Sequence, residues 1–180
     1  MLCDVSGSMD SYARMSLIFA HGLTAARRDV FTFLFGTRLT NITSALRHRD
    51  PDVSLERVAA AVADWSSGTR IWSALYAFNR QWVRRLPLRR AWVVLVTDGL
   101  DRDGAALVSE EAARLRRACG RLIWLNPLWR YAGYEACAAG ARALSPHVDE
   151  VGSAHDLASL ARLAALLATP ATWTADGSVR

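Results

Sequence analysis

The chain has 180 residues, 52% hydrophobic and 22% charged, which is typical of one globular domain with a sizeable core. Its formal net charge is +5, and all of its basic residues are arginine, since the sequence contains no lysine. No apolar run approaches the roughly 18–20 residues that a transmembrane helix needs, so we expect no membrane span. Met1 leads straight into a polar motif without a signal peptide, and we expect a cytoplasmic protein.

Strand and helix patterns alternate in the first part of the chain. Leu2–Val5 predicts a strand, but only three residues precede Asp4, whereas strands normally have about 5–6 residues. We therefore expect a truncated first strand, with the true start upstream or the chain a fragment of a longer protein. Apolar residues at 3–4 spacing predict a helix over 10–28. The β-branched and aromatic runs Val30–Phe35 and Arg38–Thr43 predict an antiparallel hairpin at a sheet edge.

The same alternation continues to the end of the chain. Ser54 is predicted to cap a short helix, and an apolar stripe predicts another helix over 70–84. Ala91–Thr97 is almost continuously apolar, which is typical of a central parallel strand buried on both faces. The later expected elements are a helix over 104–119, a strand at Arg121–Leu125, a helix over 134–144, a weak strand at His147–Val151 and a last helix capped by Asp156.

Strands that alternate with helices of this length predict an α/β fold. We expect a doubly wound, mostly parallel sheet with one antiparallel edge strand and helices on both faces. Residues 1–168 are expected to form this one domain, and residues 169–180 a flexible C-terminal tail.

Polar oxygens follow two of the expected strands and precede one helix. Asp4, Ser6 and Ser8 come directly after the first strand, Asp98 follows the central strand, and Thr69 stands at the entry to the helix over 70–84. In open α/β sheets, ligands bind beyond the carboxyl ends of the strands. Two carboxylates with three hydroxyls suit a hard cation such as Mg²⁺, which prefers oxygen ligands and keeps several waters. The alternative is an ordinary strand end followed by an Asp/Ser helix cap.

Other reactive or charged residues favour structural interpretations. Cys3, Cys119 and Cys137 are widely spaced, without the pairing expected of a zinc site or a disulfide framework. Four arginines crowd around Pro87 and could indicate a nucleic-acid patch. No interleaved aromatic residues or recognition motif accompany them, so we favour a solvated loop and expect no nucleic-acid binding. These arginines are Arg84, Arg85, Arg89 and Arg90.

The order Asp-x-Ser-x-Ser, Gly-Thr, Thr-Asp-Gly resembles the von Willebrand factor type A (VWA) domain and its metal-ion-dependent adhesion site. The resemblance implies the Rossmann-like VWA fold. It further implies that Ser6, Ser8 and Thr69 supply hydroxyl ligands, while Asp4 and Asp98 act directly or through water. An Asp or Glu from a partner protein would complete the shell of Mg²⁺, with Mn²⁺ or Ca²⁺ as alternatives.

Further segments resemble the CoxE-like branch of that family. Proteins of this branch are bacterial and are usually linked to a MoxR-type AAA+ ATPase. The founding example serves maturation of carbon monoxide dehydrogenase. The resemblance implies an interaction module that is not an enzyme and that helps to remodel or mature a client metalloenzyme. The segments are Phe35–Thr40, Asp64-Trp65, Gly68–Ile71, Asp98–Arg102 and Trp124–Leu128.

A Mg²⁺-dependent phosphohydrolase is the alternative function. Asp4 ends the first strand, where aspartyl phosphatases keep their nucleophile. Those enzymes usually carry a second Asp two residues later, where this chain has Ser6, and a Lys that balances the phosphate charge. We therefore favour the interaction module.

Overall fold

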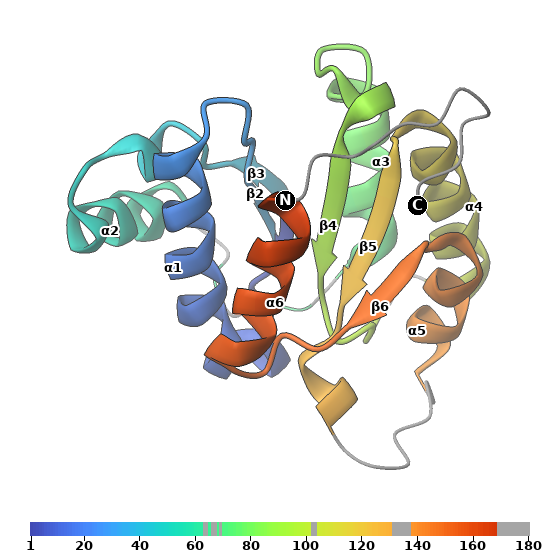
Figure 1. Cartoon of the computed structure of the whole chain (residues 1–180). Coiled ribbons are helices and arrows are strands. Elements are labelled where there is room, and N and C mark those ends of the chain that lie inside the picture. Colours follow the sequence, from blue (N-terminus) through green and yellow to red (C-terminus); the bar gives the residue numbers. More distant parts are fainter. Residues whose placement is uncertain (63–64, 66–67, 69, 102–103, 131–137, 169–180) are drawn as a thin grey trace.

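The computed structural model describes residues 1–62, 65, 68, 70–101, 104–130 and 138–168. These residues form a sheet of six strands in the order β3-β2-β1-β4-β5-β6 (Figure 1). The strands are β1 (Leu2–Asp4), β2 (Phe33–Phe35), β3 (Leu39–Asn41), β4 (Trp92–Val96), β5 (Arg121–Leu125) and β6 (Glu150–Gly152). The helices are α1 (Asp10–Ala26), α2 (Pro51–Ala61), α3 (Ile71–Gln81), α4 (Ala105–Ala118), α5 (Ala139–Leu144) and α6 (Leu157–Ala168).

Strand pairing confirms the predicted fold class. Only β3 runs antiparallel, and it pairs with β2 at the edge of the sheet. The other neighbouring strands are parallel, with β1 between β2 and β4. The chain winds outward from β1 to β2 and from β4 to β6, so the direction of winding reverses between β1 and β4. Ligands bind at such a switch point in open α/β sheets.

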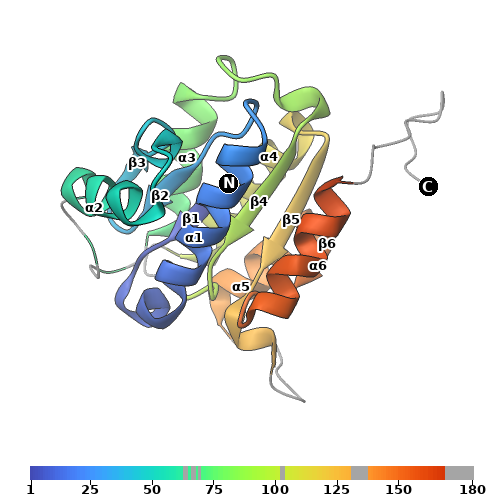
Figure 2. The same ribbon diagram turned by 60° about the vertical axis from the view of Figure 1, so that its left-hand side comes forward.

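Helices cover both faces of the sheet, with α1, α2 and α6 on one face and α3, α4 and α5 on the other (Figures 1 and 2). Successive strand side chains point to opposite faces, so each face has its own core. Leu2 and Leu95 belong to the cluster beneath α3 and α4, which we call the first core. Cys3 and Val96 belong to the cluster beneath α1 and α6, the second core.

Several elements differ in detail from the sequence prediction. Asp50, and not Ser54, caps α2, because its carboxylate accepts hydrogen bonds from the amides of Asp52 and Val53. Ser54 is buried one turn inside the helix, where its hydroxyl donates to the carbonyl of His48. The cap predicted at Asp156 is confirmed, because its carboxylate accepts a hydrogen bond from the Ser159 amide at the start of α6.

The bounds of some elements also differ from the prediction. β2 begins at Phe33 instead of Val30, and within the described part of the helix predicted over 134–144, the helix is Ala139–Leu144. The tail predicted over 169–180 and residues 131–137 lie outside the described residues. Cys3 and Cys119 are buried free thiols, as predicted for small apolar residues, and Cys137 is not among the described residues. Within the described part of the chain, no helix has the length and apolarity required to cross a membrane.

Candidate metal centre

The carboxyl ends of β1 and β4 bring Asp4 and Asp98 to the same edge of the sheet. Cys3 pairs with Val96 in the parallel ladder, so Asp4, the last residue of β1, lies beside Thr97. The two aspartates are each only 1% exposed. The charge of Asp98 is one of the causes that raise the pKa of Asp4, which places the two carboxylates within electrostatic reach of one another.

Ser6 and Ser8 lie in the loop that leads from β1 into α1. Ser6 precedes a short 3-10 turn, Gly7–Met9, and the buried side chain of Met9 anchors this turn in the second core. The hydroxyl oxygens of Ser6 and Ser8 are 3.3 Å apart. Ser6 is buried and Ser8 is exposed, so the pair of hydroxyls extends from the buried carboxylates toward solvent.

Hydrogen bonds hold both oxygens of the Asp4 carboxylate. The Ser6 amide donates to Oδ1 at 2.9 Å, and the Thr97 hydroxyl donates to Oδ2 at 2.7 Å. Burial nevertheless raises the pKa of Asp4 to about 6, since desolvation outweighs these hydrogen bonds and the nearby charge of Asp98 adds to it. The ionised form of Asp4 is therefore costly in the unliganded protein, and a cation would relieve that cost.

Asp98 presents a buried carboxylate oxygen to which no described residue donates a hydrogen bond. Its Oδ1 accepts from the Leu100 amide at 2.9 Å, whereas Oδ2 has no hydrogen-bond partner among the described residues. Four buried side-chain oxygens or nitrogens in the described part of the chain share this state, and Oδ2 of Asp98 is the one that belongs to a carboxylate. An unsatisfied buried carboxylate oxygen is unfavourable unless a ligand neutralises it.

Thr69, the fifth predicted ligand, lies outside the described residues, but its neighbours are held at the same edge. The Arg70 amide donates to the carbonyl of Gly36, which follows β2, at 3.1 Å. The Ile71 amide donates to the carboxylate of Asp101 at 2.7 Å. The segment that leads into α3 is therefore tied to the ends of both β2 and β4.

Three residues that are not among the predicted ligands support this site. Thr97 holds Asp4 through its hydroxyl, and its carbonyl accepts from the indole of Trp124. Asn126, fully buried after β5, donates its amide to the Asp98 carbonyl at 3.3 Å. Asp101 joins the loop after β4 to α3. The Thr-Asp-Gly-Leu-Asp run and the Asn-Pro pair are their sequence signals, but the contacts span 27 to 93 residues along the chain.

The residues present fit a hard cation. The donors at this edge are carboxylate and hydroxyl oxygens, which suit Mg²⁺, Mn²⁺ or Ca²⁺. Within the described ranges, no three His, Cys, Asp or Glu side chains gather where they could hold a metal ion. A cation here would therefore depend on hydroxyls and water as well as on the two aspartates. The predicted ligands that the structure describes, Asp4, Ser6, Ser8 and Asp98, lie at or after the carboxyl ends of the neighbouring strands β1 and β4.

Replacing Asp101 by alanine tests whether it positions the site. We expect unfolding free energy to fall by about 1–2 kcal/mol, because the amides of Ile71 and Gly104 lose their acceptor. We also expect roughly tenfold weaker Mg²⁺ binding by calorimetry, since loss of supporting residues typically costs 10–100-fold.

Asp50→Ala is the matched control, because it also removes a carboxylate that accepts hydrogen bonds from two amides, at the start of α2, and Asp50 is not a predicted cation ligand. It should lower stability by about 1 kcal/mol and leave Mg²⁺ affinity unchanged. Equal Mg²⁺ affinity in wild type and Asp101→Ala would contradict the positioning role.

Metal affinity should also depend on pH. Protons compete with the cation for the Asp4 carboxylate, whose pKa is raised to about 6. We expect Mg²⁺ affinity to be constant above about pH 7 and to fall roughly tenfold between pH 7 and pH 5. Calorimetric titrations across this range measure it, and a midpoint near pH 4, where an ordinary aspartate titrates, would be the contrary result.

Comparison with known proteins places this site in context. The family model described as VWA domain containing CoxE-like protein matches residues 1–160. A search of curated proteins gives no match. Solved structures with similar folds have low sequence identity to this chain, so they support the fold alone.

Three of these structures differ in the share of their own length that the match covers. Proximal thread matrix protein 1 from the mussel byssus, with a zinc-occupied MIDAS motif, is 16% identical with a TM-score of 0.55, and the match covers 92% of this chain and 45% of the mussel protein. A von Willebrand factor type A protein from Catenulispora acidiphila is 16% identical with a TM-score of 0.58, and the match covers 89% of this chain and 39% of that protein. BatB from Bacteroides thetaiotaomicron is 13% identical with a TM-score of 0.57, and the match covers 92% of this chain and 94% of BatB. The chain thus spans less than half of the first two proteins.

Proposed function

Because the chain belongs to the family of VWA domain containing CoxE-like proteins, we propose that it is a Mg²⁺-dependent protein-interaction module and not an enzyme. The observation that carries this proposal is the buried Asp98 Oδ2, which has no partner in the described chain and lies in electrostatic reach of Asp4. A cation beside these two carboxylates would satisfy both. The proposed ligands are Asp4, Ser6, Ser8, Thr69 and Asp98.

Mg²⁺ is the proposed ion because all of these ligands are hard oxygens and only two of them carry charge. Mn²⁺ and Ca²⁺ accept the same oxygens and are the alternatives. The zinc-occupied MIDAS motif of the mussel protein supports metal binding at the corresponding place in this fold. With two protein carboxylates, a bound cation would keep water ligands and would accept an outside oxygen.

An acidic side chain of a partner protein is the proposed outside ligand. The hydroxyls of Ser6 and Ser8 lead from the buried carboxylates to the surface, which gives a partner its approach. A carboxylate supplies the hard oxygen that such a cation prefers as a ligand. Leu100, 47% exposed and bonded through its amide to Asp98, offers an apolar contact beside it.

A MoxR-type AAA+ ATPase and a client metalloenzyme, such as carbon monoxide dehydrogenase, are the proposed partners. Support for them comes from the CoxE-like family itself. The chain would hold the client through the metal while the ATPase supplies the work of remodelling or maturation. Since that work consumes ATP, the proposed location is the cytoplasm.

Affinity capture from the native host tests this function. Wild-type protein and Asp98→Asn serve as baits, each in Mg²⁺ and in EDTA. We expect an AAA+ ATPase or a metalloenzyme subunit on the wild-type bait in Mg²⁺ alone. The same partners recovered equally in EDTA, or on the variant, would contradict a metal-dependent contact.

The phosphohydrolase alternative gains no support from the geometry at Asp4. Both carboxylate oxygens of Asp4 already accept hydrogen bonds, and its side chain is buried, which is a poor arrangement for an attacking nucleophile. Mg²⁺-dependent turnover of a phosphate ester that disappears in Asp4→Asn would revive it.

A further inference from the structure

Arginines without an acidic partner gather at the end of the sheet opposite the metal ligands. This end carries the starts of β4 and β5, the ends of α3 and α4, and a short 3-10 turn, Leu88–Arg90, before β4 (Figure 1). Within the described part of the chain, five exposed arginines of this end form no ion pair. We call them the arginine cluster: Arg84, Arg85, Arg89, Arg90 and Arg117.

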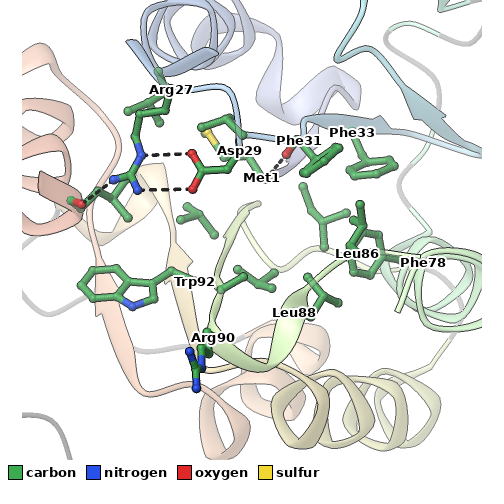
Figure 3. A pocket seen from close by; sticks show the side chains of 17 residues that line it. Met1, Arg27, Asp29, Phe31, Phe33, Phe78, Leu86, Leu88, Arg90 and Trp92 are labelled. Atoms are coloured by element: carbon green, nitrogen blue, oxygen red, sulfur yellow. Dashed lines mark hydrogen bonds and ion pairs between the residues drawn. The ribbon is translucent and has the colours of Figure 1, made fainter. Parts of the chain in front are cut away.

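Acidic side chains near this end are already neutralised by other arginines. Figure 3 shows the contrast at one cavity, where two dashed lines join Arg27 to Asp29 and none reaches Arg90. The positive charge of the cluster is therefore left to solvent or to a partner. The neutralised pairs are Arg27–Asp29 at 3.3 Å, Arg116–Asp149 at 2.7 Å and Arg121–Glu150 at 3.1 Å.

The backbone beneath the cluster is held in place. Leu88 is buried in the first core, and the Gly120 amide donates to the carbonyls of Leu88 and Ala91, both at 3.0 Å. A Cβ at Gly120 would lie 3.1 Å from the carbonyl oxygen of Arg89, so the turn after α4 packs directly on the 3-10 turn. Arg117 lies in the last turn of α4, just before this contact. Because the scaffold is already ordered, less conformational entropy is lost when a partner binds.

The cluster fits an extended ligand that carries several carboxylates. Its members follow α3, belong to the 3-10 turn and end α4, so they spread over an exposed surface where a small anion would meet few of them. Arginine binds carboxylates through two parallel hydrogen bonds, which provide both affinity and orientation. A protein segment rich in Asp and Glu presents such groups at successive positions.

Nucleic acids and membranes match this surface less well. Single-stranded nucleic acids bind through free aromatic faces as well as positive charge. Here the half-buried rings of Trp82 and Trp92 are each covered by an arginine of this chain, Arg85 at 5.8 Å and Arg121 at 5.1 Å. Peripheral membrane binding adds inserted apolar side chains. Among the described residues, the exposed large apolar side chains lie outside the segments of the cluster; they are Ile18, Tyr76, Leu100 and Leu107.

We propose that the arginine cluster is a docking surface for an extended acidic segment of a partner protein. The unpaired guanidinium groups, the ordered scaffold and the lack of free aromatic faces support this one kind of occupant. The inference is independent of the proposed function, because no proposed cation ligand takes part. It gives the chain a second binding surface, at the end of the sheet opposite the metal ligands.

Fluorescence anisotropy with a labelled peptide tests this surface. The probe alternates Glu and Gly over about twelve residues, and its uncharged counterpart has Gln in place of Glu. We expect only the Glu peptide to bind, with equal affinity in Mg²⁺ and in EDTA, so this proposal and the proposed function can fail separately. Affinity should fall at least about tenfold between about 50 and 300 mM salt, because salt screens exposed charges.

A variant that combines Arg84→Gln, Arg89→Gln and Arg90→Gln locates the contact. These exposed side chains form no ion pair with described residues, whereas Arg85 is kept because it covers Trp82. We expect at least about tenfold weaker binding of the Glu peptide, with Tm unchanged. In the wild-type protein, the peptide should shift the amide NMR signals of residues 82–91 and 116–121.

The matched control removes the same charge around α2. Three exposed arginines there stand among Asp50, Asp52 and Glu56, so their charge is balanced locally. The control should keep its affinity for the Glu peptide within about twofold of wild type. It carries Arg47→Gln, Arg49→Gln and Arg57→Gln.

Three results would overturn the proposal. The first is no binding of the Glu peptide by the wild-type protein. The second is equal weakening in the two triple variants, which would assign the binding to net charge alone. The third is much tighter binding of oligo-dT of equal charge, or of phosphatidylserine vesicles, that is lost in the cluster variant. That result would identify a nucleic-acid or membrane surface instead.

Discussion

Replacing Asp4 by asparagine is expected to abolish metal binding while the unliganded protein stays folded. Asparagine keeps the size of the side chain and one acceptor oxygen, but it removes the charge. Loss of a supporting residue at a metal site typically costs 10–100-fold in affinity, so loss of a direct ligand should cost on the order of 100-fold or more. Calorimetric titration with Mg²⁺ measures this loss.

The same variant should be at least as stable as wild type without metal at neutral pH. The pKa of Asp4 is raised from 3.8 to about 6, so the folded state binds more protons than the unfolded state between these values. Asp4 therefore contributes to the stability of the folded state at low pH, and roughly 3 kcal/mol of this contribution is lost as pH rises through about 6. Asparagine carries no charge at any of these pH values, so the variant does not suffer this loss of stability.

Asp52→Asn provides the control for charge removal, because Asp52 is exposed and pairs only loosely with Arg14 at 3.7 Å. It should leave Mg²⁺ affinity unchanged, because this exposed carboxylate is not a predicted ligand. An Asp4→Asn protein that binds Mg²⁺ like wild type would contradict the assignment of Asp4 as a ligand. A variant that is strongly destabilised without metal would contradict the proposed cost of the buried charge.

Gly140→Ala is expected to cause the largest loss of stability through packing. A Cβ at Gly140 would lie 2.5 Å from the carbonyl oxygen of Gly99 and 3.0 Å from Cβ of Asp101. Real Cβ atoms do not approach a backbone oxygen so closely, so α5 or the loop that carries Asp98 must shift. We expect unfolding free energy to fall by roughly 2–4 kcal/mol, with weaker Mg²⁺ binding.

Gly22→Ala is the matched control, because Gly22 also lies in a helix and its added Cβ meets nothing within 4 Å. Alanine is the better helix former, so this variant should gain about 0.5–1 kcal/mol. Denaturant unfolding of both variants gives the comparison. Equal stability of Gly140→Ala and wild type would show that the packing of α5 against the loop after β4 is looser than described.

Residue patterns in the sequence were sufficient for the fold class, since strand and helix periodicities alternate clearly. The hairpin around Gly36-Thr37 and the central position of β4 are confirmed by the strand order. The wrong helix cap at α2 is explained by two candidate residues that lie close together in the sequence. Asp50 and Ser54 both suit a helix cap, and Pro51, which favours the first helical position, marks Asp50 as the cap.

The candidate site was predictable only where its ligands follow a strand within a short motif. Asp4, Ser6 and Ser8 belong to one loop, and Asp98 follows an obvious strand. The supporting contacts were not predictable, because they join distant segments. Thr97 reaches Asp4 across 93 residues, and Asp101 reaches Ile71 across 30. Such pairs depend on strand order and register, which a single sequence does not give.

The central strand was predictable from its composition. The apolar run from Ala91 to Thr97 predicted a strand buried on both faces, and β4 is buried from Val93 to Val96, with Trp92 half-buried at its start.

Titration with Mn²⁺, followed by water-proton relaxation, tests the metal centre most directly. Mn²⁺ accepts the same oxygen ligands as Mg²⁺, and bound ions that keep water enhance relaxation. We expect one site with enhanced relaxation in the wild-type protein and no such site in Asp98→Asn. Absence of binding to the wild type, or the same binding by Asp98→Asn, would contradict a metal centre built on Asp4 and Asp98.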